Sequence, residues 1–357
     1  MPVSLQLLSS LTTTAVGGPA GRYLEAGTEA EIVAAVRAAD AAGEDLLILA
    51  GGSNLVVADA GYPGTVLRIA STGLQEHAGD GHVLLTVQAG HPWDQVVAHA
   101  VERGLSGLEA LSGIPGSTGA TPVQNVGAYG ADVSQTLEGV RAWDRVAGAV
   151  RTFTNADLGF GYRDSLLKRT TTNGSPRYVV LTVTFRLEAG GLSAPVAYAE
   201  LARALGLAPG ERAAAADVRR EVLRLRAGKG MVLDPADRDT FSTGSFFTNP
   251  VVPAAVAASL PDDAPNYPAG EGLVKLSAAW LIDRSGFGKG YGLPGSAGEH
   301  LAGGRASLST KHTLAITNRG GATAADILAV ARAVRSGVAE RFGIELHNEP
   351  LLIGCAL

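Results

Sequence analysis

The order of apolar and polar positions in the first hundred residues alternates between helical and extended spacing. Thr28-Glu-Ala-Glu31 has the sequence of a capping box, and Ile32, Val33 and Val36 follow it at helical spacing. We therefore predict a helix that ends at Gly43, where a left-handed glycine stops it. Short apolar runs predict strands over 46–49, 55–57 and 83–87, and Pro92 begins a second helix that ends by Gly104.

The same periodicities continue after residue 170. We predict, in chain order, a strand over 178–187, a helix after Asp217 toward Gly228, a helix over about 271–283, a glycine-rich loop over 286–304, a strand over 313–317, a helix over about 323–342 and a strand over 351–353. The stretch from 108 to 130 differs, because seven glycines and prolines among small residues leave no room for long regular elements. Such a stretch suits backbone that lies directly against a ligand.

Length and composition limit the architecture. A chain of 357 residues exceeds what one hydrophobic core usually organises, so two or three domains are expected. The hydrophobic residues, 46% of the chain, are mostly Ala, Val and Leu, and 47 glycines imply many tight turns. This mixture favours helices combined with strands.

Charge and cysteine content exclude several classes of function. Twenty-nine basic and 34 acidic residues give a net charge of -5 without a long run of one sign, so neither nucleic acid nor a membrane surface is expected as a partner. No apolar run approaches the roughly 20 residues that cross a bilayer, and the N-terminus lacks the features of a secretory signal. Cys355 is the single cysteine, which fits a reducing compartment, and we expect a cytoplasmic protein. No obligate protein partner is evident.

Metal and serine-hydrolase chemistry have no motif behind them. The seven histidines form no H-E-x-x-H pair, and one cysteine cannot build a thiolate cluster, so no metal is expected. A G-x-S-x-G elbow is also missing from the sequence.

Two glycine-rich turns are candidates for binding an anion. Gly51, Gly52, Ser53 and Asn54 follow a predicted strand, and successive amides in such a turn can converge on a phosphate. The second turn adds two hydroxyl donors and consists of Gly113, Ile114, Pro115, Gly116, Ser117, Thr118 and Gly119. Each could merely form a tight turn. Neither has the context of a Rossmann G-x-G-x-x-G, so we expect a dinucleotide site of another fold.

Three distant side chains resemble the parts of a reaction centre. Arg163 lies in Phe160-Gly-Tyr-Arg-Asp-Ser165, Ser245 in Gly244-Ser-Phe-Phe-Thr-Asn-Pro250, and Glu349 in His347-Asn-Glu-Pro350. Taken alone, Arg163 could be a surface ion pair, Ser245 a turn or helix N-cap residue, and Glu349 a solvated carboxylate.

Together these motifs resemble a known family. Gly51-Gly-Ser-Asn54, Ile114-Pro-Gly116, Gln124-Asn-Val-Gly-Ala-Tyr-Gly130, the Arg163 and Ser245 segments and Ala264-Pro-Asn-Tyr-Pro268 occur in the order found in the MurB family of UDP-N-acetylenolpyruvoylglucosamine reductases. The segment Val196-Ala-Tyr-Ala-Glu-Leu201 is similar to the longer class of the family, which carries a tyrosine loop over the substrate.

The resemblance implies a fold and a domain organisation. The expected fold is α+β, with a two-part FAD-binding domain of the vanillyl-alcohol-oxidase type and a separate α+β substrate domain. We assign residues 1–70, with the terminal strand 351–357, to the first FAD-binding subdomain, residues 71–228 to the second and residues 229–350 to the substrate-binding domain.

The resemblance also implies a reaction. NADPH would reduce noncovalent FAD, and the enolpyruvyl ether of UDP-N-acetylglucosamine would then take a hydride from flavin N5 to give UDP-N-acetylmuramate for peptidoglycan. Arg163 and Glu349 would stabilise the charge that grows on the substrate carboxylate, and one such donor is worth about 3–4 kcal/mol. Ser245 would supply the proton.

Further residues take their roles from the same resemblance. Asn125, Gly127 and Tyr129 would join the two glycine-rich turns around FAD, and Tyr198, Lys229, Asn249 and Lys275 would contact the nucleotide sugar. Two stretches, 234–243 and 291–306, depart from the family pattern. The alternatives are another flavin oxidase or dehydrogenase on the same scaffold, since fold alone does not fix substrate, or a noncatalytic nucleotide-sugar sensor.

Overall fold

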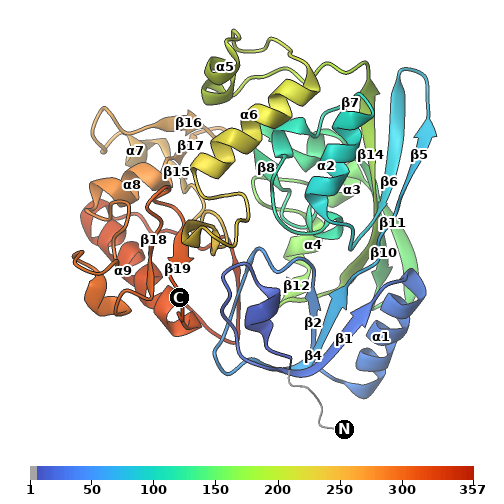
Figure 1. Ribbon diagram of the computed structural model, residues 1–357, viewed down its shortest axis with the longest axis horizontal. Helices are drawn as coiled ribbons and strands as arrows, with labels where there is room; N and C mark the ends of the chain where they lie inside the picture. The colour runs from blue at the N-terminus through green and yellow to red at the C-terminus, as the bar shows by residue number, and fades with distance from the viewer. Residues whose placement is uncertain (1–5) are drawn as a thin grey trace. The chain divides into compact units, whose positions relative to one another are not determined.

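The computed structural model describes residues 6–357, and these divide into two compact units (Figure 1). The first unit contains residue 6, Ala20–Gly52 and Tyr62–Val232. The second contains Leu7–Pro19, Ser53–Gly61 and Leu233–Leu357. Each unit is therefore assembled from segments that are far apart in the sequence.

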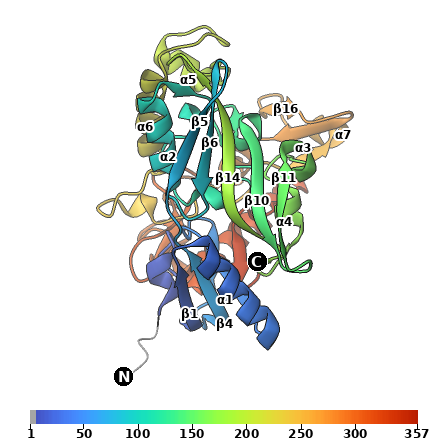
Figure 2. The same cartoon turned by 90° about the vertical axis from the view of Figure 1, so that its right-hand side faces the viewer.

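An antiparallel sheet of six strands dominates the first unit, and Figure 2 shows five of them side by side. Their order is β11-β10-β14-β6-β5, and β7 pairs with the end of β14. The bounds are β5 (Leu74–Ala78), β6 (His82–Gln88), β7 (Leu105–Ser106), β10 (Leu137–Asp144), β11 (Ala149–Thr154) and β14 (Tyr178–Ala189). The central strand β14 begins with six buried residues, as expected for a strand that is covered on both faces.

A parallel sheet with the order β1-β4-β2 is the second main sheet of this unit, and the helix α1 packs on β1 and β4. The elements are β1 (Ala20–Ala26), α1 (Glu29–Ala42), β2 (Leu46–Leu49) and β4 (Tyr62–Ile69). The predicted capping box of α1 is confirmed. The Thr28 side chain accepts from the Glu31 amide, the Glu31 side chain accepts from the Thr28 amide, and the helix ends at a left-handed Gly43.

Helices and short elements complete the first unit. Trp93, at the start of α2, packs its ring 5.6 Å from that of Phe185 in β14, which joins helix and sheet in one core. The helices are α2 (Trp93–Glu102), α3 (Asn155–Leu158), α4 (Leu166–Arg169), α5 (Ala199–Leu205) and α6 (Ala215–Gly228). The short elements are η2 (Glu109–Leu111), η3 (Thr118–Ala120), β8 (Gly127–Ala128), β9 (Ala131–Asp132), η4 (Val133–Gln135), β12 (Thr171–Thr172) and β13 (Ser175–Pro176).

The second unit packs small sheets around a long helix. The antiparallel pair β18–β19 and the helix α8 contact α9, whose apolar side is buried. The other sheets have the order β15-β17-β16 and the parallel pair β20–β3. The bounds are η1 (Leu8–Leu11), β3 (Leu55–Val57), η5 (Arg238–Thr240), β15 (Val251–Pro253), α7 (Ala254–Ala257), β16 (Asn266–Pro268), β17 (Leu273–Leu276), α8 (Ala278–Arg284), η6 (Glu299–Leu301), β18 (Ala306–Leu308), β19 (Ile316–Asn318), α9 (Ala324–Phe342) and β20 (Leu351–Ile353).

Two predicted elements of this unit were wrong in part. The helix expected over 271–283 is divided, because 273–276 pair with β15 and β16 as β17 and the helix α8 begins only after Ser277, whose side chain caps the Trp280 amide. The strand expected over 313–317 begins later, at Ile316, since the Ala315 amide closes a turn onto the His312 carbonyl. The predicted long helix and terminal strand are confirmed as α9 and β20.

The finer division of the chain into two FAD-binding subdomains and a substrate-binding domain stays a prediction. Within residues 6–357 no helix combines the length and the apolar character that a membrane span requires.

Candidate active site

The two glycine-rich turns contact each other in the first unit. A Cβ placed on Gly51 would lie 2.6 Å from Gly116 Cα, a separation that no real side chain tolerates. Gly51 and Gly116 therefore let two backbone segments approach to a distance that only glycine permits. The two candidate turns, separated by about sixty residues of sequence, form one surface of backbone.

Several polar groups of the second turn form hydrogen bonds with other residues of the protein. The amides of Gly113, Thr118 and Gly119 donate to Asp94 Oδ1 at 2.6 Å, His91 O at 2.9 Å and Ala89 O at 2.7 Å. These bonds fix the path of the turn, and the Thr118 hydroxyl also donates to His91 O at 2.9 Å.

Ser117 is the exception in this turn. It is 5% exposed, and its Oγ has no hydrogen-bond partner among residues 6–357. Buried hydroxyls are normally paired, so an unpaired one beside a tight glycine contact indicates a position for a ligand. A backbone surface of this kind could receive an anion such as a pyrophosphate, to which a serine hydroxyl can donate.

Arg163 stands at the tip of a turn that Gly161 and Asp164 close by mutual backbone hydrogen bonds. Its Nη2 donates to Gly127 O at 2.7 Å and its Nη1 to Asn125 O at 3.3 Å. The predicted segments 160–165 and 124–130 are thus brought together.

The backbone of these two segments is unusual. Arg163, Asn125 and Tyr129 have φ values of 54°, 42° and 50°, and they are three of the five non-glycine residues with positive φ in the part of the chain that the structure describes. Such conformations cost about 1–3 kcal/mol each and concentrate at functional sites. The strain therefore supports a functional role for this turn.

An aromatic pair and a lysine form a second cluster in the first unit. The rings of Tyr129 and Tyr198 meet edge to face at 5.5 Å, and Lys229 Nζ lies 5.5 Å from the centre of the Tyr129 ring. Burial raises the pKa of Tyr129 to about 12, so its hydroxyl stays protonated. Lys229 Nζ also lies 2.6 Å from Glu200 Oε2, hence a diphosphate would share this lysine with Glu200. Tyr198 is 44% exposed.

Arg226 is a candidate that the sequence interpretation missed. It is 8% exposed, and burial lowers its pKa to about 10. Its Nη2 donates to Met231 O at 2.9 Å, but its Nε is buried without a partner among residues 6–357 and faces Gly113. A spacing signal was present, because Val218, Val222 and Arg226 follow at intervals of four on the buried face of α6.

Ser245 lies in an extended segment of the second unit. Gly244 precedes it with φ of 74°, and Ser245 itself bridges to Ala315. The helix N-cap interpretation of this serine is wrong, since no helix follows it. Its neighbours Phe246 and Phe247 are each 1% exposed, so they anchor the segment in the core.

Glu349 is attached to the same segment. The Glu349 amide donates to Phe246 O at 2.8 Å, while the Phe246 amide donates to Leu314 O at 2.7 Å. Asn54 adds a contact from the first predicted turn, because its Nδ2 donates to Glu349 O at 3.4 Å. The fold of the second unit thus brings Ser245, Glu349 and Asn54 close together although nearly 300 residues separate them along the chain.

The other predicted site residues have structural contacts. Asn249 Oδ1 accepts from the Ala278 amide at 3.0 Å, which fixes the start of α8. Lys275 lies on β17 opposite Val251 and Tyr267. Within residues 6–357 no group of three or more His, Cys, Asp or Glu could hold a metal ion.

Family models match both parts of the chain. An FAD binding domain model matches residues 20–154, and a model described as the C-terminal domain of UDP-N-acetylenolpyruvoylglucosamine reductase matches residues 234–353. The predicted fold class, an FAD-binding domain joined to a second domain of helices and strands, is confirmed.

Whole-length relatives agree with these matches. A protein of Saccharopolyspora erythraea named UDP-N-acetylenolpyruvoylglucosamine reductase is 55% identical to this chain, and the alignment covers 100% of this chain and 97% of the relative. A protein of the same name from Nocardia farcinica is 56% identical, and the alignment covers 98% of this chain and 89% of the relative. The crystal structure of MurB from Thermus caldophilus superimposes with a TM-score of 0.64 at 28% identity and covers 99% of both chains. The chain therefore belongs to the UDP-N-acetylenolpyruvoylglucosamine reductase family of FAD-dependent oxidoreductases.

Proposed function

We propose that this chain reduces the enolpyruvyl ether of UDP-N-acetylglucosamine to UDP-N-acetylmuramate, with NADPH as reductant and noncovalent FAD as cofactor. The observation that carries the proposal is the 55% identity, over the whole chain, to a protein named for this reduction. Arg163, Ser245 and Glu349 stand in the motifs from which their roles were predicted.

The residues of the first unit would bind the cofactor and the substrate carboxylate. FAD bound there would supply the hydride-transfer chemistry that links NADPH to the methylene carbon of the enolpyruvyl group. The turns around Gly51 and Gly116 would hold its pyrophosphate, and Ser117 Oγ would donate to it. Arg163 would face the substrate carboxylate, because a planar guanidinium can bind both carboxylate oxygens at once.

The residues of the second unit would complete the reaction. Hydride addition leaves an enolate-like substrate whose second carbon needs a proton. Ser245 Oγ–H would provide it, since a carbanionic carbon is basic enough to deprotonate an alcohol. Glu349, which the Phe246 backbone holds beside Ser245, would assist the polarisation of the substrate.

Four residues are proposed to hold the nucleotide sugar. Tyr198 is exposed enough to fold over a ligand, and Lys229 is a cation suited to a diphosphate. Asn249 and Lys275 would contribute an amide and a second cation. The partner proposed for this protein is this small molecule, in the cytoplasm, where the single cysteine stays reduced.

The test is an anaerobic experiment in two steps. NADPH is added to the purified flavoprotein until the visible absorbance of oxidised flavin is lost, and the enolpyruvyl nucleotide is then added. The proposal expects the colour to return with this substrate and not with UDP-N-acetylglucosamine. Loss of colour with NADPH but recovery only with another acceptor would identify a different flavin enzyme, and no bleaching would favour a noncatalytic sensor.

Ser245→Ala tests the proton donor. We expect this variant to keep FAD and its rate of reduction by NADPH, but to lose at least ~10²-fold in turnover with the enolpyruvyl nucleotide, the effect of a positioned acid. Steady-state and half-reaction rates measure this. Ser259→Ala, at an exposed serine whose hydroxyl donates to Val256 O in the turn after α7, is the control. Turnover of Ser245→Ala near the rate of the unaltered protein would remove Ser245 from the mechanism.

A further inference from the structure

A tight turn of the second unit places the imidazole of His312 beside the hydroxyl of Ser245. His312 Nε2 lies 3.4 Å from Ser245 Oγ. The backbone beside them is also joined, since Ser245 bridges to Ala315 and the Ala315 amide donates to His312 O at 3.1 Å. The imidazole is therefore placed by the same short segment that pairs with the serine.

The backbone of the turn is fixed from inside. Ser309 is fully buried, and its Oγ accepts from the amides of Lys311 at 3.0 Å and His312 at 3.2 Å. The Ser309 amide donates in turn to Ala315 O at 2.8 Å. A hydroxyl that accepts from two successive amides holds the chain in one conformation.

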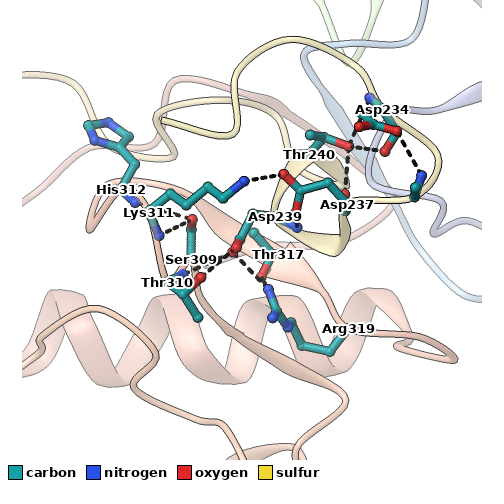
Figure 3. Close-up of polar contacts among 11 residues, drawn as sticks. Asp234, Asp237, Asp239, Thr240, Ser309, Thr310, Lys311, His312, Thr317 and Arg319 are labelled. Atoms are coloured by element: carbon teal, nitrogen blue, oxygen red, sulfur yellow. Dashed lines mark hydrogen bonds and ion pairs between the residues drawn. The ribbon is translucent and has the colours of Figure 1, made fainter. Parts of the chain in front are cut away.

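Asp239, which lies outside the 309–315 segment in the sequence, binds the same turn at Thr310 (Figure 3). It is 4% exposed and accepts from the Thr310 amide at 2.9 Å, from Thr310 Oγ1 at 2.5 Å and from Arg319 Nη1 at 2.8 Å. Burial alone would raise the pKa of Asp239, but the bonds from Thr310 and the charge of Arg319 lower it below its ordinary value. The carboxylate therefore stays ionised and keeps all three bonds.

A second aspartate holds the neighbouring side chain. Lys311 Nζ lies 2.5 Å from Asp237 Oδ2, and Figure 3 shows the His312 ring pointing away from the aspartates. Asp237 is the N-cap residue of η5 and Asp239 lies within it, in the stretch 234–243. This stretch thus binds the two residues that precede His312, Thr310 and Lys311, while the imidazole is directed elsewhere, toward Ser245.

We propose that His312 is a positioning residue for Ser245, held in place by Asp239 through the Thr310 turn, an inference that rests on the proposed function. His312 Nε2–H donates to Ser245 Oγ, so the serine's own hydrogen is directed away from the imidazole and toward the substrate carbon.

The hydrogen bond also stabilises the charge that the proton transfer leaves behind. The Oγ–H bond breaks, and the electron pair of the enolate-like substrate forms the new C–H bond. Oγ then carries a negative charge, which the His312 N–H stabilises until water returns a proton. The separation of 3.4 Å is long for a hydrogen bond, but such bonds shorten when substrate is bound.

Rapid kinetics of the two half-reactions test the role of His312. In His312→Ala, reduction of the flavin by NADPH stays within about 2-fold of the unaltered protein, while reoxidation by the enolpyruvyl nucleotide slows about 10- to 100-fold, as expected for a lost orienting contact. His312→Gln recovers at least half of that loss on a logarithmic scale, because its amide can still donate. Asp239→Asn slows reoxidation by an intermediate factor.

The control is His300→Ala, which removes an exposed imidazole of η6 in the same unit and leaves both half-reactions unchanged. Reoxidation at the normal rate in His312→Ala would overturn the inference, as would equal losses in both half-reactions or no recovery in His312→Gln. If Ser245→Ala slows reoxidation and His312→Ala does not, only this inference fails. If the unaltered protein is not reoxidised by the enolpyruvyl nucleotide, the proposed function fails as well.

A spectroscopic readout needs no turnover. In protein with ¹⁵N-labelled histidine, the signal that His312→Gln removes should show protonated Nε2, and Ser245→Ala should shift that signal more than those of the other six histidines. Protonation at Nδ1 alone would make Nε2 the acceptor of the serine hydrogen and would overturn the inference.

Discussion

At the scale of single residues, the contact between Gly51 and Gly116 makes the strongest prediction about the cofactor. A methyl group on Gly51 would lie 2.6 Å from the Gly116 backbone, so the two turns must separate in Gly51→Ala. Overpacking of this kind costs about 1–3 kcal/mol. If the turns bind FAD as proposed, its Kd should rise about 5- to 150-fold, which equilibrium titration of the apoprotein with FAD measures.

The matched control for Gly51→Ala is Gly27→Ala. A Cβ on Gly27 meets only the Glu31 carboxylate, at 3.7 Å, which is an ordinary contact. FAD affinity of Gly51→Ala equal to that of the control would show that the two turns do not cooperate in binding.

The sequence predicted the site residues where a motif was available and failed where burial alone distinguishes a residue. The Gly51 and Gly116 turns were chosen from their glycines and hydroxyls, and the structure brings them into contact. Arg226 and His312 were not chosen, because an arginine in a helix and a histidine in a loop are by default solvated. Only the packing of α6 on the Gly113 turn, and of the Thr310 turn beside Ser245, gives them special surroundings.

At the scale of elements, α9 depends on an N-terminus that three side chains satisfy. Thr323 and Asp326 form a capping box, and the Asp59 carboxylate accepts from the Ala324 amide at 2.7 Å and the Ala325 amide at 3.1 Å. Asp59 reaches α9 from the β3 segment, so one carboxylate joins an early segment to the late helix. A carboxylate here also interacts favourably with the helix dipole.

Thr323→Ala should therefore destabilise the second unit by about 1 kcal/mol, the usual cost of a lost cap, while Thr323→Ser keeps the hydroxyl and the stability. The midpoint of urea unfolding, followed by far-ultraviolet circular dichroism, measures both variants. Equal midpoints for the alanine and serine variants would mean that the Asp59 contacts suffice.

The elements that were predicted correctly carry their own local signals. The capping box before α1 marked the start of that helix, since its side chains bond within one turn. The helix expected over 271–283 failed because pairing with β15 and β16 overrides the local spacing of Leu273–Leu276. The strands β10 and β11 had no clear prediction, as β11 alternates weakly and is mostly exposed.

At the scale of the whole molecule, each unit is built from discontinuous segments, which no periodicity in the sequence reveals. The clearest case is the parallel pair of β3 and β20, whose residues Leu55 and Leu351 are almost 300 positions apart. Both segments were singled out as short apolar runs, but their pairing depends on contacts that a single sequence does not encode locally.

Acid should weaken the folded molecule through buried carboxylates, and Asp144 tests this for the first unit. Hydrogen bonds from Arg177, above all, and from the Ala147 and Val146 amides hold its pKa below the ordinary 3.8. Because the folded pKa is the lower one, this stabilisation is complete above about pH 5 and is lost as pH falls through the folded pKa. Asp144→Asn should lower the urea midpoint near about pH 7, and the difference from the unaltered protein should shrink toward about pH 3.

Asp80→Asn serves as the control for acid sensitivity, because Asp80 is exposed and its backbone carbonyl, which the substitution keeps, is the atom that contacts His82 Nδ1. Its urea midpoint should follow that of the unaltered protein at every pH. A constant difference between Asp144→Asn and the unaltered protein across the range would contradict the assigned pKa direction.

Removal of the proposed cofactor should also lower the stability of the whole folded molecule. Since the Ser117 hydroxyl is buried without a partner among residues 6–357, apoprotein keeps an unsatisfied donor that FAD would pair. A ligand that binds only the folded state adds about 2.7 kcal/mol at a hundred times its Kd. The thermal unfolding temperature of deflavinated protein should therefore rise as FAD is added, and riboflavin, which lacks the pyrophosphate, should raise it far less.

In Ser117→Ala the FAD-induced rise of the unfolding temperature should be smaller, while the apoprotein melts at the same temperature or slightly higher. An undiminished shift in that variant would place the pyrophosphate away from Ser117, and equal shifts with FAD and riboflavin would show that the glycine turns do not bind phosphate at all.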